Sequence, residues 1–186
     1  RKSIFEQGAP WPESLLMAHV VFSPKSCEQG PTSCQNLPPI TILSASYRVF
    51  SSCMFRILIP WHDSWRPAEI CGGRPGTDAL QAAIDLGLAL EEAMVLHNKG
   101  VLMISLDLSI VFDSIEWGLA LEFGLPPSYV RVFLAFLSGL KRKFKVGDTF
   151  SQDGRTTLCG TPQGDALSIL WANLASLILA RRVKNL

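Results

Sequence analysis

An aspartate, Asp107, follows directly after a run of residues, 101–106, that is apolar except for Ser105. A run of this length is typical of a strand that is buried on both faces. A buried carboxylate without a partner is costly, so an aspartate presented where such a strand ends is well placed to bind a metal ion. Mg²⁺ prefers one or two carboxylates together with phosphate oxygens, as in two-metal phosphoryl transfer. The alternative is that Asp107 caps a turn and that Asp113 caps the following helix.

A second polar segment, residues 160–164, contains a Pro-Gln-Gly core and lies between an expected strand and an expected helix. Its glycines allow the backbone to approach a ligand closely. The side-chain amide of Gln163 can both donate and accept hydrogen bonds, which suits a surface that contacts a nucleotide. An ordinary strand-to-helix loop, with Asp165 as the helix cap, would have the same composition.

Periodicity and turn residues predict the elements that would position these two segments. Strands are expected at 18–22, 101–106 and 141–146, with a second hairpin strand that ends near Leu158. Helices are expected at 42–61 with an end in the segment from Pro60 through Pro67, at 78–97 with Thr77 as the N-cap, from Asp113 or Ser114 to Gly124, from Pro126 onward, and at 165–182. Residues 23–39 are expected to form a long loop. Strands this far apart in sequence indicate an α+β fold rather than a doubly wound sheet.

The composition limits the class of protein. The chain has 186 residues, enough for one domain or a large part of one, and 48% of them are hydrophobic whereas only 18% are charged. Globular chains typically carry about 25% charged residues. A well-buried domain would explain this surplus of apolar residues, and so would a piece of a larger protein whose apolar faces meet other segments. We favour the second interpretation.

Neither the net charge nor the cysteines identify a partner. The net charge is +1, so a nucleic-acid site must be argued from local clusters of basic residues. One such cluster is the basic strand formed by Lys141, Arg142, Lys143 and Lys145. This strand could equally be a solvated face of a hairpin. The five cysteines form no CxxC pair and the three histidines have no zinc spacing. We therefore expect an intracellular protein, in the nucleus or cytoplasm and not secreted. No apolar run reaches the ~18 residues of a membrane span, and the chain does not begin with a signal peptide.

Together, the two polar segments resemble motifs of reverse transcriptases, especially those of retrotransposons that lack long terminal repeats. Residues 107–113 are similar to the first palm motif of that family, in which an aspartate precedes a small residue, an aromatic residue and a second aspartate. Residues 160–168 are similar to the next motif, in which a Pro-Gln-Gly core leads into an apolar helix. Weaker similarities lie upstream at 20–25, 39–48 and 73–78, so the resemblance covers about residues 18–182.

The resemblance implies an α+β fold with polymerase-like fingers and a partial palm, whose antiparallel strands pack on helices. Residues 1–186 would form a partial reverse transcriptase domain, fingers-like over about 18–100 and palm, with a fingers insertion, over about 101–182. The implied activity is that of an RNA-directed DNA polymerase, a nucleotidyltransferase that uses Mg²⁺, or Mn²⁺ in its place. The implied partners are an RNA template, a DNA primer, deoxynucleoside triphosphates, and the remaining palm and thumb of a parent polyprotein, with no membrane.

The resemblance implies roles for two groups of residues in the metal and nucleotide site. Asp107 would be a catalytic metal ligand, and the carbonyl of Leu108 would join it. Phe112, which spacing alone would assign to the core, would lie under the sugar of the incoming nucleotide and exclude a 2′-hydroxyl by bulk. Val111 stands where the family has a small residue, and it would crowd the same nucleotide pocket.

The resemblance also implies substrate contacts outside the metal site. Gln163 and Gly164 would line the nucleotide and template pocket. Lys25 and Arg74 would contact triphosphate or template phosphates, since charge-assisted hydrogen bonds to phosphate are strong.

The chain departs from the family pattern most seriously in an absence. Family members carry an aromatic-x-Asp-Asp hairpin beyond the Pro-Gln-Gly helix, and no Asp-Asp pair occurs in this sequence. We therefore expect a fragment that does not polymerise DNA alone, because a two-metal site needs further carboxylates. In addition, Pro38 replaces an arginine, and Ala166 and Ile169 replace prolines. A non-catalytic nucleic-acid-binding derivative and an inactive relic remain as alternatives.

Overall fold

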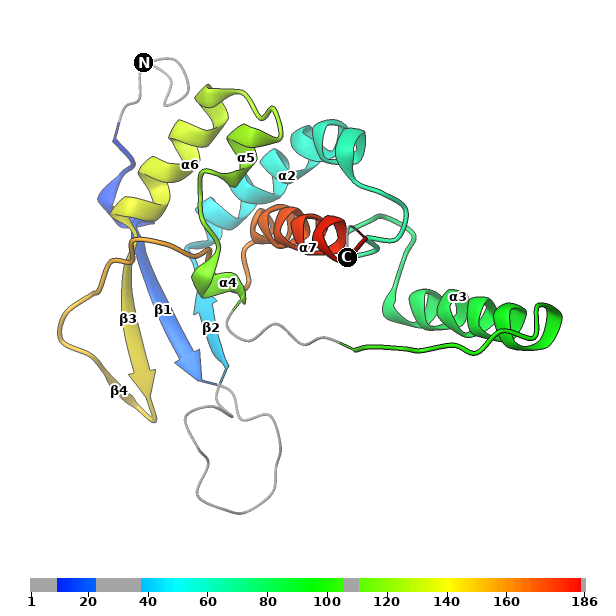
Figure 1. The fold of residues 1–186 in the computed structure, drawn as a ribbon. Coiled ribbons are helices and arrows are strands. Elements are labelled where there is room, and N and C mark those ends of the chain that lie inside the picture. The colour runs from blue at the N-terminus through cyan, green and yellow to red at the C-terminus, as the bar shows by residue number, and fades with distance from the viewer. Residues whose placement is uncertain (1–9, 23–37, 106–110, 185–186) are drawn as a thin grey trace.

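The computed structural model describes residues 10–22, 38–105 and 111–184. Within these ranges the protein has an α+β fold, with six α-helices and one open four-stranded sheet (Figure 1). The predicted fold class is therefore confirmed at this level. The expected loop at 23–39 falls almost entirely outside the described residues. None of the helices in the described ranges has both the length and the apolar character needed to cross a bilayer.

The sheet is mixed, with the strand order β2-β1-β3-β4. Its strands are β1 (Met17–Phe22), β2 (Pro39–Ile42), β3 (Lys141–Val146) and β4 (Thr149–Phe150). The two outer pairs are antiparallel, whereas the central pair, β1 with β3, is parallel, with Met17 opposite Lys141. The expectation of an antiparallel sheet is thus wrong for the central pair.

The hairpin of β3 and β4 is shorter than predicted, because β4 ends at Phe150 rather than near Leu158. The Ser151 hydroxyl accepts a hydrogen bond from the Phe144 amide at 3.1 Å and so replaces a backbone partner from a longer strand. One isolated bridge, between Arg142 and Arg155, continues the pairing. Leu158 itself is 94% exposed.

The helices differ in how much of their surface they bury. They are η1 (Glu13–Leu15), α2 (Ala45–Trp65), α3 (Ala79–Glu91) continued by the π-helix η3 (Glu92–Leu96), α4 (Val111–Ser114), α5 (Leu119–Glu122), α6 (Pro127–Gly139) and α7 (Ser168–Lys184). Figure 1 shows that α2, α5, α6 and α7 gather at the end of the sheet where β1 and β3 begin. The start of α6 at Pro127 confirms the prediction from the paired prolines.

The core lies between α2, α6 and α7 and is built on stacked aromatic rings. Tyr47 of α2 stacks on Phe136 of α6 with ring centroids 3.5 Å apart, and Phe133 stacks on Trp171 of α7 at 4.4 Å. All four rings are buried. Full burial of an aromatic side chain contributes about 1.5–3 kcal/mol relative to exposure, so these contacts hold the three helices firmly together.

Helix α2 runs through Pro60, the first residue of the segment 60–67 in which the sequence predicts its end. A proline removes one backbone hydrogen bond of a helix, but tertiary contacts hold the turns that follow. Leu58 and His62 are buried, and the Trp61 indole donates to the Phe123 carbonyl at 2.8 Å. Packing therefore outweighs the local effect of Pro60, and α2 ends later in the predicted segment, at Trp65.

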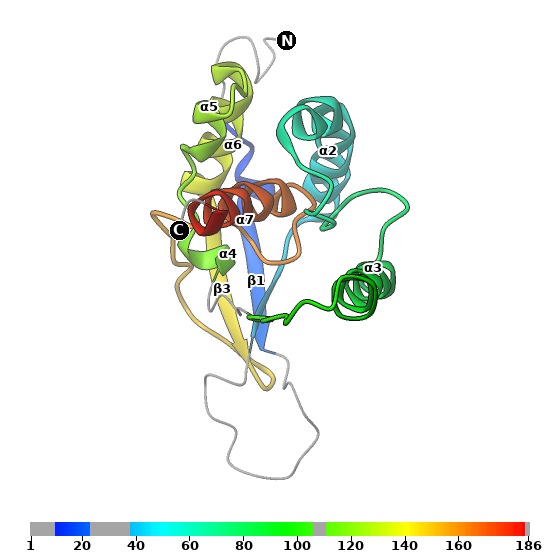
Figure 2. The ribbon, with the colours of Figure 1, turned by 45° about the vertical axis from the view of Figure 1, so that its right-hand side comes forward.

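Helix α3 and the segment after it stand apart from the helical core in both views (Figures 1 and 2). No residue of α3 or η3 is buried. The predicted buried strand at 101–106 is wrong for its described part, residues 101–105, which is extended but pairs with no strand among the described residues. Leu102 is 84% exposed and Ile104 is 71% exposed.

Three predicted helix starts also need correction. Asp78, and not Thr77, caps α3, because its side chain accepts a hydrogen bond from the Gln81 amide at 2.7 Å. Asp113 lies inside α4 rather than at its cap, and the predicted helix to Gly124 is divided into α4 and α5. Helix α7 begins at Ser168, because the residues from Asp165 form a turn first.

Candidate functional site

The segment 160–167, which we call the Pro-Gln-Gly loop, connects the β-hairpin region to α7 and has a special backbone conformation. Gly160 has a φ of +81° and Gly164 has a φ of +111°. Residues with a Cβ rarely adopt these backbone angles. The Ser168 hydroxyl donates to the Pro162 carbonyl at 2.9 Å, and the Asp165 amide donates to the same carbonyl at 3.1 Å. These bonds close the loop against the start of α7.

The loop is hydrogen-bonded to the segment 112–117, which follows the aspartate motif in sequence. The Thr161 amide donates to the Phe112 carbonyl at 2.5 Å, and the Gly160 amide donates to the Ile115 carbonyl at 3.0 Å. The Trp117 indole donates to the Gly160 carbonyl at 2.5 Å. The two segments that carry the predicted motifs are therefore in direct contact.

The loop also contacts β2, which is part of the segment 39–48. The Thr41 amide donates to the Gln163 carbonyl at 3.0 Å. A Cβ added to Gly164 would lie 3.3 Å from the Thr41 carbonyl oxygen, so glycine allows this close approach. Three segments that are distant in sequence thus meet at one loop.

The predicted site residues divide into those the structure brings together and those it does not describe. Phe112 and Gln163 are half-buried and Gly164 is exposed, all at the contact between the loop and its neighbours. Val111 opens α4, but its side chain lies outside the described parts of the structure. Three others lie outside the described residues altogether, namely Lys25, Asp107 and Leu108, whereas Arg74 is described.

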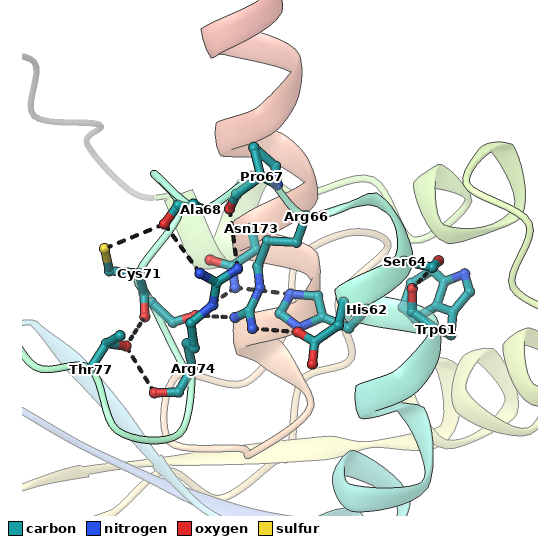
Figure 3. Close-up of polar contacts among 12 residues, drawn as sticks. Trp61, His62, Ser64, Arg66, Pro67, Ala68, Cys71, Arg74, Thr77 and Asn173 are labelled. Carbon is teal, nitrogen blue, oxygen red and sulfur yellow. Dashed lines mark hydrogen bonds and ion pairs between the residues drawn. The ribbon is translucent and has the colours of Figure 1, made fainter.

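Arg74, predicted to contact phosphate, lies in a different part of the molecule. Its guanidinium donates to the Pro67 carbonyl at 3.4 Å and to the Ala68 carbonyl at 3.3 Å (Figure 3). The side chain is half-buried and holds its own loop together. The structure therefore does not bring Arg74 into hydrogen bonding with the Pro-Gln-Gly loop.

A groove of about 520 Å³ runs beside the Pro-Gln-Gly loop between α2 and α7. Its lining residues come from α2, the loop after α2, the Pro-Gln-Gly loop and α7: Arg48, Ser51, Ser52, Phe55, Gly73, Gly164, Asp165, Ala166 and Ile169. A second groove of about 480 Å³ on α2 shares Arg48 and Ser52 with the first and adds Arg56. Sequence reasoning missed these two exposed arginines, although their i,i+8 spacing on one helix face is visible in the sequence.

Asp165 lies behind this groove and links the loop to α2. The carboxylate is buried and accepts a hydrogen bond from the Tyr47 hydroxyl at 3.5 Å. Burial raises the pKa of Asp165, while the Ser51 hydroxyl and nearby backbone amides oppose that rise. Burial, together with the Asp165 charge, raises the pKa of the Tyr47 hydroxyl, so the tyrosine remains a hydrogen-bond donor.

The basic strand does not present all of its cations to solvent. Arg142 is buried and pairs with Asp113 at 3.6 Å, whereas Lys141 is exposed and Lys143 and Lys145 are half-buried. Burial lowers the pKa of Arg142, and the Asp113 carboxylate opposes that change. Arg142 therefore acts within the fold and is not available to a nucleic acid.

The described residues do not form a metal site. Among them, no three histidine, cysteine or acidic side chains are arranged to hold an ion. Asp113, the described carboxylate nearest in sequence to Asp107, is already paired with Arg142. The predicted metal ligands, Asp107 and Leu108, fall outside the described ranges.

Comparison with known proteins adds no identification. No protein-family model matches the chain, and no curated protein is significantly similar to it.

Proposed function

We propose that this chain is part of the polymerase domain of a reverse transcriptase of the non-LTR retrotransposon type. The reaction would be attack of a primer 3′-hydroxyl on the α-phosphorus of a deoxynucleoside triphosphate, directed by an RNA template, with release of pyrophosphate. The intact polymerase would carry out this nucleotidyl transfer, and the chain alone would be inactive because it contains no Asp-Asp pair.

The observation that supports this proposal best is the contact among three separate motif segments. The Thr161 amide bonds to Phe112, and the Thr41 amide bonds to Gln163, so the Pro-Gln-Gly loop is the common neighbour of the other two. A binding site for one ligand needs its residues together in space, and sequence resemblance alone does not require that these segments meet. Contact among them is what a shared nucleotide pocket would need.

Within this proposal the residues have distinct tasks. Phe112 would support the sugar of the incoming nucleotide, with Val111 narrowing the same space. Gln163 and Gly164 would contact the nascent base pair, since an amide offers both a donor and an acceptor and a glycine permits close approach. Lys25 would contact a phosphate. Arg74 would reach phosphate only if it gave up its two carbonyl partners.

The grooves beside the Pro-Gln-Gly loop support a path for the template strand. Arg48 and Arg56 are exposed on one face of α2, and no ion pair to either is found among the described residues. A row of exposed cations beside a groove attracts a phosphate backbone. A template that passes Gly164 would thus continue along α2.

The exposed apolar surface supports the proposal that further polymerase segments cover part of this chain. Leu88 of α3 is 59% exposed, and Leu102 and Ile104 in the extended segment are more exposed still. Apolar surface gathered in this way commonly marks an interface. We propose that the remaining palm and the thumb of the parent protein occupy it.

The metal requirement rests on donor chemistry. Asp107 and the carbonyl of Leu108 would hold Mg²⁺, or Mn²⁺ in its place, because both donors are oxygens. The ion would supply charge stabilisation to the phosphate oxygens during transfer.

The test is deoxynucleotide incorporation on a primed RNA template by the product of the longest reading frame that contains this chain. The Asp107→Asn variant should lose activity by at least about 1,000-fold, since a ligand of a catalytic ion contributes several kcal/mol to the transition state. Asp148→Asn, in the exposed turn between β3 and β4, is the matched control and should retain activity. A folded product that binds primed RNA without extending it would contradict the enzyme proposal and favour a binding derivative.

A further inference from the structure

The loop at 66–78 connects α2 to α3 and is fastened to the helical core by a small set of polar contacts (Figure 3). Asn173 of α7 is buried and donates from Nδ2 to the Gly72 carbonyl at 2.7 Å. The same Nδ2 lies 3.0 Å from Nε2 of His62, a buried residue of α2. One side-chain amide therefore joins two helices and the loop.

The orientation of this amide fixes the state of the histidine. A carbonyl oxygen can only accept, so the NH₂ group of Asn173, and not its oxygen, must face Gly72. That NH₂ group has no lone pair to offer, so Nε2 of His62 must accept from it. Nε2 is then unprotonated, and the imidazole is neutral.

The surroundings of His62 make a positive charge there unfavourable. Arg66 is buried and donates to the Gly72 carbonyl at 3.2 Å and to Asp63 at 2.5 Å. Arg74 approaches from the loop, and the Trp65 ring packs edge-on at 4.9 Å between centroids. Two arginines and one carboxylate thus face the ring, while α7 contributes the uncharged Asn173.

We propose that His62 and Asn173 form a pH-sensitive latch. The neutral latch holds the 66–78 loop, and with it Arg74 and the start of α3, against α2 and α7. Protonation of His62 removes the acceptor, places an N–H against the NH₂ group of Asn173, and releases the loop.

The pH range of the latch follows from the shift of the histidine. Burial first, and then the Arg66 charge, lower the pKa of His62 from 6.5 to about 4 in the closed state. An open loop returns the ring to water and to its ordinary value. The latch is therefore fully effective above pH 6.5 and is progressively lost as the pH falls toward 4. Between pH 7 and pH 5 the opening constant should rise by roughly twentyfold.

Amide hydrogen exchange of the full chain tests this proposal without any catalytic assay. The amides of Arg74 and Thr77 donate within the loop at 3.1 and 3.2 Å and report on its closure. After correction for intrinsic exchange, their protection should fall by roughly twentyfold from pH 7 to pH 5. The amide of Phe136, in the core of α6, should keep its protection and so exclude global unfolding.

Two variants distinguish the protonation of His62 from the loss of the hydrogen bonds made by Asn173. His62→Gln keeps an acceptor that does not titrate, so loop protection should be the same at both pH values. Asn173→Ala removes the hydrogen bonds to Gly72 and His62 and should lower loop protection at both pH values. His97→Gln is the matched control, because His97 is an exposed histidine beside Glu92, and it should behave as the wild type.

Two results would overturn the latch. One is loop protection in the wild type that does not change between pH 7 and pH 5, and the other is a full loss of protection in His62→Gln. If that variant does not fold, nuclear magnetic resonance titration of the wild type decides the question. The His62 ring and the Arg74 amide should share one midpoint well below 6.5, and separate midpoints would refute the proposal.

Discussion

Gly160 is the point at which the Pro-Gln-Gly loop passes closest to the segment after Asp107. A Cβ built there would lie 2.5 Å from the Asp113 carbonyl oxygen and 2.6 Å from its Cα, both backbone atoms. The φ of +81° is also unfavourable for any residue with a Cβ. Gly160→Ala therefore imposes both strain and a steric overlap that no side-chain rotation can relieve.

The cost of this substitution can be estimated from the contacts that must break. The left-handed conformation costs an alanine roughly 1–2 kcal/mol. Moving the loop away would strain three hydrogen bonds, at roughly 1 kcal/mol each: Gly160 to Ile115, Trp117 to Gly160, and Thr161 to Phe112. The expected loss in the free energy of unfolding is therefore about 4–5 kcal/mol.

Gly124→Ala is the matched control, because Gly124 has a φ of +78° but nothing lies within 4 Å of an added Cβ. It should cost only the strain, about 1–2 kcal/mol. Urea unfolding followed by tryptophan fluorescence gives the stability of both variants. The urea concentrations at the unfolding midpoints are compared, provided that the dependence of the unfolding free energy on urea concentration is the same. Equal destabilisation by the two substitutions would refute the close packing of the Pro-Gln-Gly loop on the segment 112–117.

Two further predictions concern the groove beside this loop. Because burial raises the pKa of Asp165, the folded protein should lose stability as the pH rises through that raised value. Asp165→Asn should remove this part of the pH dependence of stability, as measured by urea unfolding. A variant that keeps the wild-type pH dependence would contradict the assignment. The double variant Arg48→Ala/Arg56→Ala should reduce the magnitude of the slope of log affinity against log salt concentration, for single-stranded RNA, by roughly 1.4. Arg131→Ala, which changes an exposed arginine on α6, should leave the slope unchanged. An unchanged slope in the double variant would show that the nucleic acid binds elsewhere.

Local sequence signals predicted the elements whose neighbours in sequence determine them. The paired prolines predicted the start of α6, a short apolar run predicted β1, and alternation predicted β3. Within the predicted end segment 60–67, local signals did not show that α2 continues past Pro60, because the burial of His62 and the Trp61 contact with Phe123 hold its last turns. No local pattern contains those distant contacts.

The segment 101–105 shows a different limit of sequence reasoning. Its apolar run is typical of a buried strand, but burial requires a partner, and among the described residues none is present. Arg142 shows the reverse case, because a basic strand suggests an exposed face, whereas Asp113 pairs with this arginine inside the fold. In both cases the outcome depends on what lies opposite in space.

For the candidate site, the motif residues were predictable and their surroundings were not. Gln163, Gly164 and Phe112 could be named from the sequence, and the structure places their segments in contact. The roles of Asp107, Leu108 and Lys25 stay predictions. The groove lined by Arg48 became visible only when α2, the Pro-Gln-Gly loop and α7 were placed together.

If the Pro-Gln-Gly loop contacts a nascent base pair, a footprint of the ternary complex should show it. The product of the longest reading frame that contains this chain is bound to an RNA template with a chain-terminated DNA primer, and hydrogen exchange of the Gln163 and Gly164 amides is followed. We expect slower exchange of these two amides when the complementary deoxynucleoside triphosphate is added and no change with a non-complementary one. Exchange that is the same with both nucleotides, in a complex that has bound the primed RNA, would contradict this contact.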